Sequence, residues 1–198
     1  MNFWDQRYHL AGVSYGTEPN DFLRAQVAAL PRGRILSLCE GEGRNAVFLA
    51  SHGYEVLAID GSSVGLKNAQ DLARRRGVKI ETQVVDLADY NIAPDCWDGV
   101  VLIFAHLPGL IRQRIHHQAV AGLRSGGVLL LEAFGSGQIT RNTGGPKNPD
   151  LLPSLEQLQL ELQGLDFMLL QEIQRDVHEG RYHTGRAEVV QIIGRRKS

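Results

Sequence analysis

Short apolar segments alternate with amphipathic segments over the first two thirds of the chain. Five segments are apolar, or alternate with period two, and are rich in Val, Ile and Leu, which predicts β-strands. They span residues 35–39, 55–59, 79–85, 99–104 and 128–134. Between them, residues 63–76 and 110–123 carry apolar positions at helical spacing, which predicts helices with one buried stripe. Strands that alternate with helices predict a doubly wound α/β sheet, mostly parallel, in three layers.

The alternation ends after residue 134. Residues 135–153 hold four glycines and three prolines and are predicted to form a long loop, a kind of segment that is usually functional or mobile. Residues 154–163 are helix-like, and two strand-like segments, 167–174 and 186–193, flank a polar turn around residues 178–180. These last two segments predict a C-terminal antiparallel β-hairpin that closes the sheet.

Composition limits the class of protein and of partner. The chain has 198 residues, of which 43% are hydrophobic and 22% charged, as expected for one globular domain. The formal net charge of -1 argues against nucleic acid and anionic lipid as partners. The N-terminal segment does not follow the pattern of a secretion signal, and no apolar run approaches the ~18 residues of a membrane span. Only two cysteines occur, without metal-site spacing, which favours a reducing, cytoplasmic location.

The most informative segment is the turn between the first strand and the next helix. Residues 34–50 run from an apolar strand through Gly41 and Gly43 into an apolar helix start. Turn glycines let the backbone approach a ligand, and the helix start presents free N–H groups, as in nucleotide cofactor sites. Residues 41–46 also fit the dinucleotide fingerprint G-x-G-x-x-A, so a nicotinamide cofactor is one interpretation. The turn alone does not decide between cofactors.

An acid at the end of the second strand narrows the choice of ligand. Asp60 lies where ligands bind in open α/β sheets, and its carboxylate can accept both hydroxyl protons of a ribose. The alternative is an Asp that caps the following helix or turn. Ser62 is likewise a candidate N-cap of that helix.

Several further motifs resemble one family. They are residues 4–8, 15–20, 41–46, 104–108, 144–147 and 179–183. With the closing hairpin, they resemble the class I S-adenosylmethionine-dependent methyltransferases, and in particular their small tellurite-resistance-type branch. The resemblance covers nearly the whole chain and implies a Rossmann-like methyltransferase fold. It also implies that S-adenosylmethionine is the methyl donor, S-adenosylhomocysteine the product, and a small molecule such as an oxyanion or a thiol the acceptor.

The resemblance assigns parts of the chain to parts of the site. It implies one methyltransferase domain over residues 1–198, divided into four sections. Residues 1–33 cover the cofactor, 34–134 form the cofactor-binding core, 135–153 form a substrate-side loop, and 154–198 form a helix and the closing hairpin. The implied cofactor-binding residues are Tyr15, Cys39, Glu40, Gly41, Gly43, Asn45, Asp60, Gly61, Ser62, Asp86, Leu87 and Phe104.

Two of these assignments have specific reasons. Asp86 stands where the family's third strand ends and an acid accepts from the adenine amino group, although an Asx-turn is the structural alternative. Tyr15 belongs to an N-terminal aromatic set with Trp4, Tyr8 and Phe22, whose rings can stabilise a sulfonium or simply clasp the segment. Two strand-end acids and a glycine turn favour an adenosyl ligand over NAD.

The first strand departs from the family pattern. Many relatives carry an acid where Ser37 stands and a glycine where Cys39 stands. We hypothesise that Glu40 supplies the missing negative charge near the ammonium of the cofactor, so that Glu40→Gln weakens S-adenosylmethionine binding. Cys39 is expected to be a buried, unreactive thiol.

One residue is a candidate for proton transfer. His106 follows the fourth strand, where the family exposes its active-site wall, and an imidazole there can accept a proton from the acceptor near neutral pH. The alternative is transfer by positioning alone. His178, Glu179 and His183 lack the spacing of a metal site, so no metal is expected. Arg181 and His183 either face the pocket or lie in solvent.

Two other functions remain open at this point. A small NAD(P)-dependent oxidoreductase can use the same glycine turn, but it does not need Asp86 or the closing hairpin. A non-catalytic S-adenosylmethionine-binding module is the second alternative, since the altered first strand can cost turnover without abolishing binding.

Overall fold

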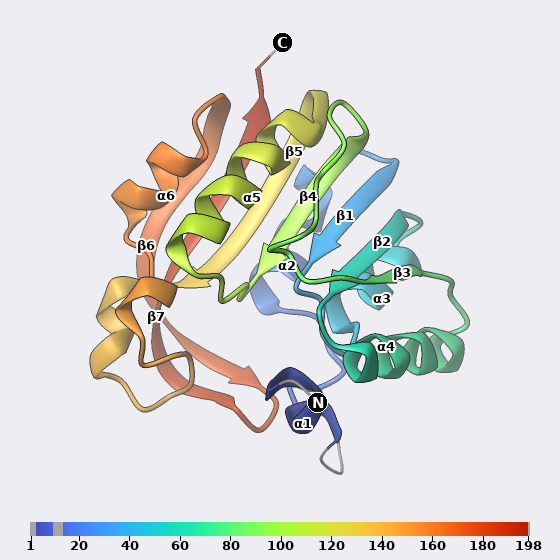
Figure 1. Ribbon diagram of the computed structural model, residues 1–198, viewed down its shortest axis with the longest axis horizontal. Helices are drawn as coiled ribbons and strands as arrows, with labels where there is room; N and C mark the ends of the chain where they lie inside the picture. The colour runs from blue at the N-terminus through green and yellow to red at the C-terminus, as the bar shows by residue number, and fades with distance from the viewer. Residues whose placement is uncertain (1–2, 10–13, 198) are drawn as a thin grey trace.

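The computed structural model describes residues 3–9 and 14–197 and is built on a seven-stranded sheet (Figure 1). The strands are β1 (Arg34–Leu38), β2 (Glu55–Asp60), β3 (Glu81–Val84), β4 (Trp97–Ile103), β5 (Leu123–Phe134), β6 (Leu165–Glu179) and β7 (His183–Arg196). Their order in the sheet is β3-β2-β1-β4-β5-β7-β6. The first five are parallel, while β7 is antiparallel to β5 and β6 to β7. The predicted mostly parallel sheet with its C-terminal antiparallel hairpin is confirmed.

Helices occupy the predicted segments and part of the N-terminal region. They are α1 (Phe3–His9), α2 (Asp21–Gln26), α3 (Arg44–Ser51), α4 (Ser63–Arg76), α5 (Gly109–Gly122) and α6 (Leu155–Glu161), with short 3-10 turns η1 (Val27–Ala29), η2 (Ser136–Thr140) and η3 (Pro149–Leu151). Among the described helices, none has the length and apolar character needed to cross a membrane. Residues 1–2 and 10–13 of the predicted cofactor-covering segment, and residue 198, lie outside the described residues.

The alternation of side chains along the strands builds two separate cores. Ile35 and Val101 face one core, in which the apolar residues of α2, α3 and α4 pack against the sheet. Leu36 and Val100, their chain neighbours, face the other core, which is covered by α5 and α6. Successive residues of a strand point to opposite faces, so strands buried on both faces read as continuous apolar runs. The chain therefore forms the three layers predicted from its sequence.

The predicted strand ends differ from the observed ones at the two edges of the sheet. The third strand covers only Glu81–Val84 and is largely exposed. The hairpin strands are much longer than predicted, and His178 and Glu179 belong to β6 rather than to a turn. An edge strand with one solvated face alternates polar and apolar residues, and its polar positions resemble turn residues in the sequence.

The predicted long loop is folded onto β7. Its two 3-10 turns, η2 and η3, divide residues 135–153 into short connections. The buried Gln138 side chain donates to the carbonyl of Gly144 at 2.8 Å and accepts from the N–H of Glu188 at 3.0 Å. One amide side chain thus fixes the loop by replacing the hydrogen bonds that a regular element would make.

Gly43 should tolerate alanine far less well than an exposed glycine of similar backbone conformation. Its φ is 85°, and a Cβ at this position would overlap Ala69 of α4, whereas Gly77 has a φ of 69° and open space around it. We expect Gly77→Ala to lower the free energy of unfolding by about 1 kcal/mol from backbone strain alone. Gly43→Ala adds overpacking, for a total of about 3 kcal/mol. Urea unfolding of both variants measures this difference, and equal losses would contradict tight packing of α3 on α4.

Candidate functional site

A cavity of about 430 Å³ lies at the carboxyl ends of the central parallel strands. Its lining residues are Phe3, Trp4, Tyr8, Tyr15, Gly16, Cys39, Glu40, Glu42, Arg44, Asn45, Asp60, Gly61, Asp86, Leu87, Ile103, Phe104, His106, Leu107, Pro108, Ile111 and His183. β1 and β4 are neighbours, although β1 is followed in the chain by β2, so the strand order reverses here. Such a switch point is where open α/β sheets bind ligands. Ten of the thirteen predicted site residues line the cavity.

The three other predicted residues support the cavity from behind. Gly43 starts α3 and packs against α4. Gly41 lies under the ring of Tyr8, where a Cβ would come within 2.5 Å of the tyrosine oxygen. The wholly buried Ser62 caps α4 by accepting from the N–H of Gly65 at 3.0 Å. The backbone of the glycine turn is therefore covered by an aromatic ring of α1.

Glu40 joins β1 to the start of α3. Its Oε1 accepts from the N–H groups of Asn45 and Ala46 at 3.0 and 2.9 Å, and the hydroxyl of Ser37 donates to its Oε2. A carboxylate at a helix N-terminus satisfies free N–H groups and complements the helix dipole. Burial nevertheless raises the pKa of Glu40 above its usual value. The acid also lines the cavity, so its expected role near an ammonium group stays a prediction.

Asp60 is fixed by two backbone N–H groups. Gly41 donates to its Oδ2 at 2.9 Å and Ser62 to its Oδ1 at 2.8 Å. The residue is 8% exposed, and burial raises the pKa of its carboxyl. Each carboxylate oxygen has two lone pairs, so both retain an acceptor site for a ligand hydroxyl. Asp60 organises the glycine turn and remains able to bind a diol.

The segment after β3 contributes an exposed acid and a buried leucine to the cavity. Oδ1 of Asp86 accepts from the N–H of Ala88 at 2.8 Å, which is the geometry of an Asx-turn. Asp86 is exposed and lines the cavity, and Leu87 beside it is 4% exposed. The turn occupies Oδ1 of Asp86 and holds the carboxylate at the edge of the cavity.

The end of β1 and the end of β4 both carry unusual backbone angles. Cys39 has a φ of 55° and Phe104 a φ of 51°, in the left-handed region that non-glycine residues rarely occupy. Such strain costs about 1 to 3 kcal/mol and concentrates at ligand sites. Desolvation raises the pKa of the Cys39 thiol and disfavours the thiolate, but Cys39 is half-buried and lines the cavity, so its predicted lack of reactivity stays a prediction.

His106 belongs to an aromatic wall beyond β4. Its ring stacks on Phe134 with centroids 5.8 Å apart, and Phe104 stacks on the same ring at 4.5 Å. Burial, with a smaller effect of Arg7, lowers the pKa of His106 to about 4. The imidazole is therefore neutral at physiological pH.

α1 closes the cavity with rings and one cation. Trp4 stacks on Tyr8 at 5.9 Å, and Arg7 donates to the hydroxyl of Tyr15 at 2.9 Å. Tyr15 lines the cavity as predicted. Phe22, a residue of α2, instead packs in the hydrophobic core. Burial raises the pKa of the Tyr8 hydroxyl, so this group is a neutral donor or acceptor.

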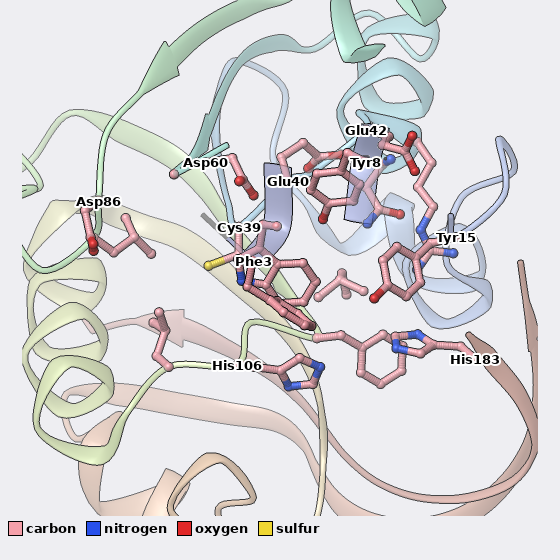
Figure 2. Close-up of a pocket in the computed structure, with 18 of the residues that line it drawn as sticks. Phe3, Tyr8, Tyr15, Cys39, Glu40, Glu42, Asp60, Asp86, His106 and His183 are labelled. Carbon is pink, nitrogen blue, oxygen red and sulfur yellow. Dashed lines mark hydrogen bonds between the residues drawn. The ribbon is translucent and has the colours of Figure 1, made fainter. Parts of the chain in front are cut away.

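Arg44 and His183 also line the cavity; Arg44 was not predicted to do so, and the sequence left open whether His183 faces the pocket or solvent. The guanidinium of Arg44 is paired with Glu179 of β6. His183 is the first residue of β7 and is 5% exposed, while Arg181 in the turn before it is exposed. Figure 2 shows Tyr15 and His183 on the side of the cavity opposite Asp86. The alternation of His183, Gly185 and Ala187 along β7 was the one sequence signal for an inward His183.

The described residues contain no group of three or more His, Cys, Asp or Glu side chains arranged to hold a metal ion. The cavity instead combines carboxylates toward β2 and β3, a wall of aromatic and imidazole rings beyond β4, and a guanidinium from α3. This arrangement suits an organic ligand with hydroxyl groups at one end.

Comparison with known proteins agrees with this geometry. Residues 35–127 match the family model described as a methyltransferase domain. A SAM-dependent methyltransferase from Methanosarcina mazei is 18% identical over 91% of this chain and 99% of its own, with a TM-score of 0.70. TehB from Haemophilus influenzae is 19% identical over 98% of this chain and 66% of its own, with a TM-score of 0.74. No curated protein matches the chain.

A third solved structure extends the range of similar proteins. It is described by the conversion of a disulfide bond into a thioacetal group during echinomycin biosynthesis. The two chains are 18% identical over 94% of this chain and 85% of the other, with a TM-score of 0.75. At these identities the likeness concerns the fold, and several chemistries are known to share one fold.

Removing the carboxylate of Glu40 should destabilise the protein more than neutralising it. Glu40→Ala leaves two buried N–H groups without an acceptor, so we expect a loss of about 2 to 4 kcal/mol in the free energy of unfolding. Glu40→Gln keeps one acceptor oxygen and should lose about 1 kcal/mol. Glu55→Ala, at an exposed position of β2, is the control and should change stability by less than about 0.5 kcal/mol. A Glu40→Ala variant as stable as this control would refute the capping role.

Proposed function

We propose that this chain, in which residues 35–127 match a methyltransferase domain, uses S-adenosylmethionine and moves its sulfonium methyl group to a small-molecule acceptor. The proposal rests mainly on one observation, the volume of the cavity. The cavity at the strand ends has about 430 Å³, near the low end for sites of small ligands and cofactors. A site of this size that must also hold the cofactor leaves room for a small acceptor only.

The lining residues fit the chemical groups of the cofactor. Asp60 has acceptor capacity for the ribose hydroxyls, and Gly61 beside it has no side chain to fill the space at the end of β2. Leu87 offers an apolar surface and Asp86 a carboxylate oxygen to an adenine ring. Cys39, Glu40 and Asn45 would border the methionine part. When bound, S-adenosylmethionine supplies an electrophilic methyl group on a sulfonium, next to which aromatic rings are favourable.

The protein's own contribution is orientation in a water-poor cavity. Tyr15, Phe104 and His106 form the wall where the acceptor would lie. Methyl transfer from a sulfonium neutralises charge, so no strong stabilisation of an anion is required, and correct placement supplies much of the rate. A neutral His106 can accept the proton that a thiol, hydroxyl or amine acceptor releases.

Two further features of the chain agree with the proposal. A single continuous sheet supports one catalytic domain, and both cysteines are free thiols, which supports a reducing, cytoplasmic setting. The net charge of -1 favours a small molecule over nucleic acid as acceptor. An oxyanion and a thiol are the acceptor types that we would test first.

Ligand binding tests the cofactor assignment. We expect S-adenosylmethionine and S-adenosylhomocysteine to raise the melting temperature and NAD to leave it unchanged. Asp60→Asn should weaken S-adenosylhomocysteine binding about 10- to 100-fold in calorimetry, because charge-assisted hydrogen bonds to the ribose are lost. Asp89→Asn, at an exposed position outside the cavity, is the control. Stabilisation by NAD alone would reject the proposal, and binding without labelled methyl product across a panel of thiols and oxyanions would favour a non-catalytic module.

The role of His106 predicts a specific pH dependence. His106→Asn should lower kcat/KM about 100-fold if the imidazole accepts the acceptor's proton. Because its pKa is lowered to about 4, the side chain stays neutral down to about pH 5, so the wild-type to variant ratio should be constant from pH 8 to pH 5. The ratio should fall toward one only near pH 4, when His106 becomes protonated. A ratio near one throughout would show that positioning alone drives the reaction, and a drop centred at pH 6.5 would contradict the lowered pKa.

A further inference from the structure

One end of the cavity is formed mainly by rings, and we call it the ring wall (Tyr15, Phe104, His106 and His183). The ring centroid of His183 lies 4.6 Å from that of Tyr15 and 4.8 Å from that of Phe104. The rings of His106 and His183 are 6.5 Å apart. In Figure 2, His106 and His183 occupy the lower part of the view, away from the strand-end acids at the upper left. The acceptor therefore meets rings rather than carboxylates.

The guanidinium groups near the ring wall are already matched by acids. Among the described residues that line the cavity, Arg44 is the one arginine or lysine, and it pairs with Glu179. Arg175 pairs with the buried Glu132 at 2.6 Å. A further acid, Glu42, is 8% exposed and lines the cavity. An anionic acceptor would thus lose its hydration without gaining an uncompensated cation.

The ring wall disfavours cations as well. Arg7 donates to the hydroxyl of Tyr15 at 2.9 Å, and its guanidinium lies 4.3 Å from the ring centroid of Tyr182. Burial first, and then nearby positive charge that includes Arg7, lowers the pKa of His106 to about 4 and that of His183 to about 2. Surroundings that keep two imidazoles uncharged also oppose a positive charge placed beside them.

A thiol fits such surroundings better than the other common methyl acceptors. At neutral pH an ordinary thiol, with a pKa of about 8.5, is mostly uncharged, whereas an amine with a pKa of about 10.4 is a cation. A buried hydroxyl needs a hydrogen-bond partner. A thiol forms only weak hydrogen bonds, and sulfur makes favourable contacts with aromatic rings. Rings that surround a dry space are therefore suited to a thiol with an apolar remainder.

We propose that the ring wall binds an uncharged thiol with an apolar body and excludes oxyanions and other charged acceptors. This inference rests on the proposed methyltransferase function. The acceptor sulfur forms a bond to the methyl carbon while the bond from that carbon to the sulfonium sulfur breaks, and the electron pair of the broken bond stays on that sulfur. The thiol proton passes to the neutral His106, which later releases it to solvent. One thiol and one sulfonium thus give two thioethers and one proton.

Three thiols with one branched skeleton test the preference without requiring turnover. They are 3-methylbutane-1-thiol, 3-mercaptopropionate and 2-(dimethylamino)ethanethiol, which at about pH 6.5 are neutral, anionic and cationic. Calorimetry with the protein saturated with S-adenosylhomocysteine should give the neutral thiol a Kd at least about tenfold lower than that of either charged thiol. Selenite, an inorganic oxyanion, should also bind at least about tenfold more weakly than the neutral thiol.

Each other outcome has a defined meaning. Equal affinities, tighter binding of a charged thiol or of selenite, or no binding of 3-methylbutane-1-thiol would overturn the proposal. Failure of S-adenosylhomocysteine itself to bind would count against the proposed function instead. Transfer of labelled methyl from S-adenosylmethionine should follow the same order of acceptors, and faster transfer to selenite than to the neutral thiol would also overturn the proposal.

A cation introduced beside the ring wall should weaken the preference for the neutral thiol. Phe3 of α1 lines the cavity and is 60% exposed, and the guanidinium of Arg7 lies 4.7 Å from its ring centroid. Phe3→Lys should lower the Kd ratio of the anionic to the neutral thiol at least about fivefold. Gln6→Lys is the control, exposed on the same helix and outside the cavity lining, and should keep the ratio. An unchanged ratio in Phe3→Lys, or the same change in both variants, would overturn the proposal.

Discussion

One buried carboxylate, Glu179, connects parts of the chain that are distant in sequence. It accepts from Arg44 at the start of α3, from Arg175 within β6, and from the side chain of Asn20, which caps α2, at 2.9 Å. Removing one member of such a buried cluster leaves an uncompensated charge and typically costs about 3 to 5 kcal/mol. The closing hairpin, the glycine turn and the N-terminal segment are thus held in one arrangement, and each of the three contributes residues to the lining of the cavity.

The same cluster explains why the hairpin is long. β6 and β7 pair from Leu165 and Arg196 to Glu179 and His183, well past the end of β5 at Phe134. This extension carries Glu179 and His183 beyond the sheet edge to the cavity, where the turn lies against the N-terminal segment and Arg181 donates its N–H to the carbonyl of Ser14. A shorter hairpin would leave the cavity open on this side. The length of a strand usually depends on core packing. Here the length of β6 and β7 determines which residues form one wall of the cavity.

The sequence predicted the layers, the carboxyl ends of the five parallel strands to within one residue, and ten of the residues that line the cavity, because these depend on local patterns. Period-two and period-3.6 alternation identifies strands and helices, and strand-end acids such as Asp60 follow directly. Arg44 was missed, and the position of His183 was left open, because their surroundings depend on partners far along the chain; Glu179 is 135 residues from Arg44. The turn position of His178 and Glu179 was wrong because His178 lies on the exposed face of the edge strand β6, whereas Glu179 is a buried acid paired with Arg44 and Arg175. Buried polar clusters of this kind have no local pattern in a single sequence.

The glycine turn, which fits a dinucleotide fingerprint, is physically unsuited to a pyrophosphate. In that use the N–H groups at the helix start bind phosphate oxygens. Here the N–H groups of Asn45 and Ala46 already donate to Glu40, and the neighbouring Glu42 accepts from the N–H of Ser14 at 2.7 Å. Two carboxyl groups stand where a dianionic ligand would need positive potential. Glu40 and Glu42 thus disfavour a ligand with phosphates at this turn, while the idea that Glu40 replaces the strand acid of many relatives, where Ser37 stands, remains a prediction.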